Sequence, residues 1–127
     1  MFMREIKFRG LDVMTGKWVY GNCLITGTGI NYIVPQNLIA NSLPQWRVDK
    51  STVGEYTGLK DVNGKDIYEG DIIRYFSGEE QEHHLEVKWN SIDACFDLGW
   101  VRTIYAVQGE VIGNTYENPE LLKGGSS

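Results

Sequence analysis

The fold is decided by residues 85–100, which read LEVKWNSIDACFDLGW. If residues 91–94 form a four-residue loop, Asn90 faces Cys95 and Lys88 faces Asp97, a pair of opposite charge. Large apolar side chains then fall together on the other face of the hairpin. They are Leu85, Val87, Trp89, Phe96, Leu98 and Trp100. A slip of one residue destroys both features, so the pattern predicts an antiparallel hairpin of fixed register that supplies much of the core.

A second turn is indicated by the dipeptide Asn63-Gly64. A two-residue turn at this point would set Asp61 against Asp66, and two like charges directly opposite each other destabilise a hairpin. A three-residue loop over residues 62–64 instead sets Asp61 against Lys65 and gives Asp66 a lysine neighbour as well. The sequence therefore predicts a type I turn with Gly64 in the left-handed region.

Short strands joined by turns account for most of the remaining sequence. Glycine is frequent, with 15 of 127 residues, and short apolar runs lie between the glycines. Strands are expected at residues 5–9, 18–20, 23–26, 30–34, 72–76 and 110–113, with a hairpin turn at 27–29. Residues 68–71 predict a tight turn that contains Gly70 and Asp71. Near the C-terminus, Asn118 is expected to cap a helical turn whose first position is Pro119.

Length and charge exclude several classes of protein. A chain of 127 residues suits one domain, or two very small ones that share a core. The 12 Lys+Arg against 17 Asp+Glu give a net charge of −5, which argues against a general binder of nucleic acid or anionic membranes. No apolar run approaches the roughly 18 residues of a membrane span, and the N-terminus lacks the apolar stretch of a secretion signal. We therefore expect a cytoplasmic protein whose two cysteines, Cys23 and Cys95, are reduced.

Three motifs follow one another along the chain. They are residues 4–9 (REIKFR), residues 53–73 (VGEYTGLKDVNGKDIYEGDII) and residues 109–122 (GEVIGNTYENPELL). Together they resemble the YopX family of small phage and prophage proteins, with Leu11 as a minor departure. The resemblance implies a mostly β fold in which an N-terminal β-hairpin subdomain, residues 1–50, packs with a C-terminal SH3-like barrel, residues 51–122. A flexible tail at residues 123–127 follows. It also implies a life in the bacterial host cytoplasm, and it supplies no catalytic residues.

The densest acidic cluster consists of Asp61, Asp66, Glu69 and Asp71. Such a cluster could hold a divalent metal ion for phosphoryl chemistry, which would make the protein a metal-dependent hydrolase. The same residues are explained by turn chemistry, because aspartate is common at turns and two of these aspartates gain lysine partners. The spacing does not follow the calcium-loop pattern, so we prefer the turn interpretation and expect no metal or cofactor.

His83 and His84 are the two histidines of the chain. Neighbouring residues of a strand point to opposite faces, so the two cannot easily bind one ion. In the predicted register about 20 Å of strand separates the residue opposite His84 from Cys95, which excludes a zinc site made from both. We expect the histidines on a solvent-facing edge and expect Cys23 and Cys95 to be inert thiols.

The candidate binding residues are Trp46 and Arg47, which adjoin an aperiodic stretch at residues 36–46. Trp and Arg are enriched in interface hot spots, so we predict a non-catalytic accessory protein that binds a host or phage protein. Self-association through exposed strand edges is a further expectation. The alternative is a small barrel that binds nucleic acid, which the small number of cations disfavours, and the hydrolase is the third hypothesis.

Overall fold

The protein is described by a computed structural model that covers residues 5–35, 45–78, 81–92, 95–99 and 108–124. The chain divides into two compact units, Met1–Tyr56 and Thr57–Ser127. The boundary that we expected at residues 50/51 falls within a short 3-10 helix, η1 (Lys50–Thr52). The described residues are mostly β-strand in antiparallel sheets, which confirms the predicted β class.

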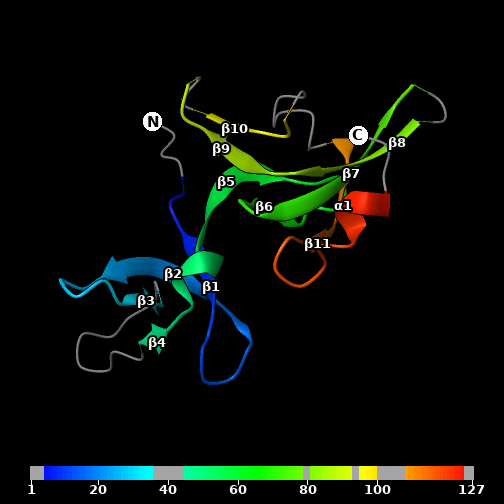
Figure 1. Ribbon diagram of the computed structural model, residues 1–127. Coiled ribbons are helices and arrows are strands. Elements are labelled where there is room, and N and C mark those ends of the chain that lie inside the picture. The colour runs from blue at the N-terminus through cyan, green and yellow to red at the C-terminus, as the bar shows by residue number, and fades with distance from the viewer. Residues whose placement is uncertain (1–4, 36–44, 79–80, 93–94, 100–107, 125–127) are drawn as a thin grey trace, which may run out of the picture. The chain divides into compact units, whose positions relative to one another are not determined.

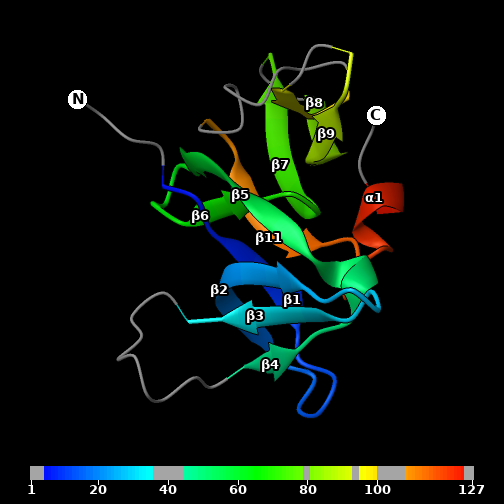
Figure 2. The same ribbon diagram turned by 90° about the vertical axis from the view of Figure 1, so that its left-hand side faces the viewer.

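The first unit is built on an antiparallel sheet with the strand order β4-β3-β2-β1-β5. Figure 2 shows β2, β3 and β4 side by side. The strands are β1 (Phe8–Leu11), β2 (Trp18–Ile25), β3 (Asn31–Val34), β4 (Trp46–Arg47) and β5 (Gly54–Lys60), of which β5 continues into the second unit. The predicted turn at residues 27–29 is confirmed, because β2 pairs with β3 in a register that sets Ile25 opposite Asn31.

The second unit contains a three-stranded antiparallel sheet of order β11-β7-β8 and a two-stranded sheet of β9 and β10 (Figure 1). The β5 strand also pairs with β6 in this part of the chain. The elements are β6 (Asp66–Tyr68), β7 (Asp71–Ser77), β8 (Gln81–Glu86), β9 (Lys88–Asn90), β10 (Cys95–Asp97), β11 (Glu110–Asn114) and α1 (Leu121–Gly124). Among the described residues the strands form no closed barrel.

The register predicted for residues 85–100 is confirmed where it is described. Asn90 pairs with Cys95 and Lys88 pairs with Asp97, as expected. The expectation that Trp89 belongs to the core is wrong, because its side chain is 48% exposed. The hairpin pattern does not show what covers the hairpin. In the structure β9 and β10 form a separate two-stranded sheet, and Trp89 packs edge-to-face on Phe96 with ring centroids 5.1 Å apart. Trp100 lies outside the described residues.

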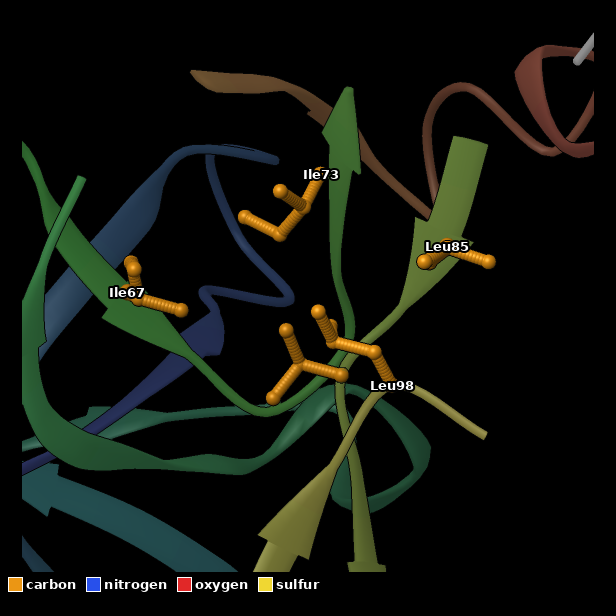
Figure 3. Packing of buried hydrophobic residues seen from close by; sticks show 5 residues of the cluster. Ile67, Ile73, Leu85 and Leu98 are labelled. Carbon is orange, nitrogen blue, oxygen red and sulfur yellow. The ribbon is translucent and has the colours of Figure 1, made fainter. Parts of the chain in front are cut away.

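The core of the second unit is a cluster of aliphatic side chains from four segments. Its buried members are Ile67, Ile73, Leu85, Val87 and Leu98 (Figure 3). Val87 occupies the break between β8 and β9, where its backbone N–H donates to the Asp71 carbonyl and its carbonyl accepts from Gly70 N–H, both at 2.9 Å. Each fully buried side chain of this size contributes about 1.5–3 kcal/mol before ordering costs.

The predicted turn at residues 62–64 is also confirmed. Gly64 has a φ of 81°, and the backbone N–H of Asp61 donates to the Lys65 carbonyl at 2.8 Å. The ammonium of Lys60 lies 2.6 Å from Asp66 Oδ1, so the charges pair as the three-residue loop requires. The turn after β6 forms as well: Gly70 has a φ of 94°, and Asp71 Oδ2 accepts a hydrogen bond from the backbone N–H of Tyr68 at 2.8 Å.

The expected helix cap is replaced by a different contact. Helix α1 begins at Leu121, two residues after Pro119, and Asn118 Oδ1 accepts from the backbone N–H of Asn114 at 3.2 Å. The Asn118 backbone carbonyl, and not its side chain, accepts from Leu121 N–H at 3.0 Å. Asn118 therefore closes the turn after β11, which precedes the helix. Of the stretches discussed above, residues 36–44 of the aperiodic segment and residues 125–127 of the tail lie outside the described residues.

Candidate binding surfaces

The predicted binding residues Trp46 and Arg47 form the whole of β4, the last strand in the sheet order of the first unit. Trp46 pairs with Ile33, which is fully buried, and Arg47 pairs with Tyr32. Successive residues of a strand point to opposite faces, so these two side chains do not share a surface. Trp46 lies half-buried on the face of Ile33, whereas Arg47 is exposed on the other face.

Arg47 belongs to a group of exposed or half-buried side chains, and the sequence analysis missed the other members. The registers set Arg47 opposite Tyr32 and Tyr32 opposite Leu24, and Tyr20 lies on the same face four residues before Leu24. Tyr20 is 49% and Leu24 48% exposed. We call these four residues the outer face of the first unit. The available signal was the sequence of β2, WVYGNCLI, which carries large apolar residues on both faces, although Gly21 is its one buried residue.

Two cations of the first unit are engaged within the fold, and one of them, Arg9, is only 6% exposed. Arg9 lies opposite Tyr20 on the neighbouring strand, and its guanidinium carbon is 4.4 Å from the centroid of the Trp18 ring. Lys7 lies 4.7 Å from the Tyr56 ring centroid and 2.9 Å from a Glu5 carboxylate oxygen. The first unit holds six Lys+Arg and four Asp+Glu, a net charge of +2, whereas the second holds six and thirteen, a net charge of −7. The acidic character of the chain therefore belongs to its second unit.

The acidic cluster predicted from the sequence is used in turns. Asp61 accepts hydrogen bonds from the backbone N–H groups of Asn63, Lys65 and Val111 at 2.8–2.9 Å. Burial opposes the charge of Asp61, but these three N–H groups and the Lys65 ammonium outweigh it and hold its pKa below the ordinary value. Asp71, the other buried member of the cluster, is only 1% exposed and closes the turn after β6.

Two further motif residues support this arrangement. The Asn63 side-chain amide donates to Glu110 Oε2 at 3.1 Å, which ties the turn to β11, and Glu110 also contacts the Arg74 guanidinium of β7. Among the described residues, no group of three or more His, Cys, Asp or Glu side chains is placed to hold a metal ion. The structure thus brings Asp61 and Asp71 to separate backbone partners and Asp66 to the Lys60 ammonium.

The expectation of solvent-facing histidines is wrong. His83 is buried, and its Nε2 lies 2.6 Å from Ser77 Oγ. His84 points to the opposite face, where Nδ1 lies 2.6 Å from the Leu121 carbonyl oxygen and Nε2 lies 2.6 Å from Glu82 Oε2. The reason is tertiary. The C-terminal turn at α1 covers the His84 side of β8, and His83 lies on the same face as Leu85, which belongs to the core. A two-strand pattern cannot reveal either cover.

Both cysteines are free and half-buried. Burial raises the pKa of the Cys23 thiol, which disfavours the nucleophilic thiolate. No helix in the described part of the chain is long and apolar enough to cross a membrane.

Three comparisons with known proteins bear on this structure. A family model described as YopX protein matches residues 7–123. The SPbeta prophage-derived uncharacterized protein YopX of Bacillus subtilis (strain 168) is 38% identical over 76 residues, which cover 50% of this chain and 54% of that protein. The match therefore spans about half the length of this relative. Protein EF1440 from Enterococcus faecalis has a similar fold, with a TM-score of 0.58 and 24% identity over 94% of this chain and 99% of its own.

Proposed function

This chain belongs to the YopX protein family, and from that premise we propose that it is a phage or prophage accessory protein that binds a protein partner without catalysis. The prophage origin of the Bacillus subtilis relative supports the phage part of the proposal. The proposed place of action is the bacterial host cytoplasm. We also propose that the strands of the second unit follow an SH3-like arrangement. The antiparallel pairing of β7 with β8 supports this part of the proposal.

The observation that carries the proposal is the outer face of the first unit. Tyr32 and Leu24 place aromatic and aliphatic surface next to the exposed Arg47, and Tyr20 lies on the same face about 13 Å along β2 from Leu24. Contiguous exposed apolar surface marks interaction sites, and Tyr and Arg are among the residues that contribute most to binding energy at interfaces. The partner that fits this face presents apolar side chains beside a carboxylate. The non-catalytic part of the proposal is supported by the use of Asp61 and Asp71 as acceptors for backbone N–H groups.

Site-specific photocrosslinking tests the proposal. A photoreactive phenylalanine analogue placed at position 20 should capture one discrete protein in infected or lysogenic cells. The matched control carries the same analogue at Phe76, which is 52% exposed in the second unit. A second change, Leu24→Ser, should abolish the capture at position 20. Equal capture from both positions contradicts the proposal, and a crosslink between two copies of the chain would show that the partner is the protein itself.

Nucleic acid is the second candidate, and the charge distribution favours it. The outer face combines aromatic rings with the exposed Arg47 on the unit of net positive charge, and single strands bind to rings and cations of this kind. Fluorescence anisotropy with a labelled 20-nucleotide oligo(dT) separates the two functions. Binding that weakens steeply as NaCl rises, and that Arg47→Gln weakens, would establish nucleic acid as the ligand in place of protein.

A further inference from the structure

The other face of the first-unit sheet contains a pocket of about 410 Å³. This volume falls in the range of small-molecule sites, which is about 300–1,000 Å³. The residues that matter for its chemistry are Phe8, Cys23, Ile25, Asn31, Lys50 and Val53. The registers place Cys23 and Ile25 on the opposite side of β2 from Tyr20 and Leu24, so the pocket is separate from the outer face.

Asn31 gives this pocket an unusual polar group. The residue is only 7% exposed, and it lies opposite Ile25, a second lining residue, at the start of β3. Its backbone carbonyl accepts from Val48 N–H at 3.0 Å. Asn31 lines the pocket, so its side-chain amide can donate a hydrogen bond to a ligand that enters there.

Lys50 gives the pocket its charge. It alone carries a charge among the lining residues, and it is exposed at the beginning of η1. The Val48–Asn31 hydrogen bond brings this part of the chain alongside Asn31. The neighbouring carboxylate of Asp49 is occupied by the backbone N–H and the hydroxyl of Ser51, at 3.0 and 2.8 Å. The rest of the lining is largely apolar, with Phe8, Ile25 and Val53 around the opening.

We propose that this pocket binds a free small-molecule carboxylate with an apolar body. The carboxylate lies between the Lys50 ammonium and the Asn31 amide, both of which can donate hydrogen bonds to it. The hydrocarbon or aromatic body lies against Phe8, Ile25 and Val53. This binding site goes beyond the proposed function, because neither the residues nor the sheet face are those of the outer face.

Titration followed by ¹⁵N–¹H NMR tests the proposal, with 4-phenylbutyrate as the probe. We expect shifts at the Asn31 side-chain amide and at the Cys23 and Val53 backbone amides, with millimolar or tighter affinity. The uncharged 4-phenylbutanol should bind at least fivefold more weakly. Lys50→Gln should weaken binding at least fivefold, whereas Lys17→Gln, an exposed lysine of the same unit outside the pocket, should not change it. Equal binding of acid and alcohol, or equal affinity of the two lysine variants, would overturn the proposal.

Alkylation of Cys23 provides an independent readout that needs no pocket mutation. In a Cys95→Ser background, saturating 4-phenylbutyrate should slow the reaction of Cys23 with iodoacetamide severalfold, because Cys23 lines the pocket. An unchanged rate would contradict the proposal. A peptide with a free C-terminal phenylalanine should bind no tighter than the free acid, and tighter binding would assign the pocket to protein chain ends instead. The crosslinking test at position 20 is unaffected by either outcome.

Discussion

At the scale of single residues, Asp61 shows how one carboxylate can secure a turn. Its Oδ1 accepts from two N–H groups of the turn, and its Oδ2 reaches Val111 N–H on β11 at 2.9 Å. An asparagine keeps one acceptor oxygen and places an amide donor where the other oxygen was. We therefore expect Asp61→Asn to lower the free energy of unfolding by about 1–3 kcal/mol in urea denaturation at pH 7.

The same residue predicts a pH dependence. Because the pKa of Asp61 is lowered in the folded state, its contribution to stability is present above the ordinary carboxyl pKa of about 4. This contribution is lost as the pH falls through the lower, folded-state pKa. Denaturation midpoints measured between about pH 6 and pH 2.5 should fall less steeply for Asp61→Asn than for the wild type. Parallel curves for the two proteins would contradict this assignment.

Gly70 is a second residue whose identity is set by its surroundings. It has a φ of 94°, and a Cβ at this position would lie 2.9 Å from the Tyr116 ring. Gly64 also has a positive φ, but a Cβ there meets no atom within 4 Å. Gly64→Ala should therefore cost only the backbone strain, about 1–2 kcal/mol, and Gly70→Ala should cost more. In urea denaturation, Tyr116→Ala should recover part of the Gly70→Ala loss, and equal losses for the two alanine variants would refute the steric contribution.

At the scale of elements, His84 joins two parts of the second unit that are distant in sequence. One ring nitrogen contacts the Leu121 carbonyl of α1, and the other contacts Glu82, both at 2.6 Å. His84→Ala removes both contacts and should lower the free energy of unfolding by about 1–2 kcal/mol. Hydrogen exchange of the C-terminal segment should accelerate more than that of β7. His84→Gln, which keeps a polar group on this face, should recover part of the protection, and uniform acceleration would contradict a local role.

The elements also show which features a sequence can predict. The Gly64 turn and the β9–β10 register depend on residues a few positions apart, so charge pairing and turn chemistry were sufficient to predict them. The exposure of Trp89 and the burial of His83 depend on which layers cover a strand, and alternation within one strand carries no such information. For the same reason, the sequence alone did not predict the outer face. Arg47 was predicted to bind, but its neighbours Tyr32 and Leu24 were found only from strand pairing.

At the scale of the whole molecule, the net charge of −5 conceals two opposite contributions. The first unit carries a net charge of +2 and the second a net charge of −7. This difference becomes visible only when the chain is divided after Tyr56. A count over the whole chain argues against anionic ligands, whereas the first unit alone does not. The carboxylate pocket and Arg47 of the outer face both belong to this unit. The charge that opposes anion binding is therefore carried by the other unit.

The charge difference predicts an uneven response to salt. Repulsion among the thirteen carboxylates of the second unit disfavours its compact state, and NaCl screens that repulsion as the Debye length falls from about 30 Å at 0.01 M to about 8 Å at 0.15 M. We expect the thermal midpoint of the intact chain to rise by a few degrees over this range, as about 1 kcal/mol would produce. Hydrogen exchange should slow in Thr57–Ser127 more than in Met1–Tyr56, because the first unit carries little net charge.

Sucrose at matched osmolality controls for general stabilisation and should protect both units alike. A midpoint that falls with salt would mean that attractive pairs such as Lys60–Asp66 outweigh the repulsion.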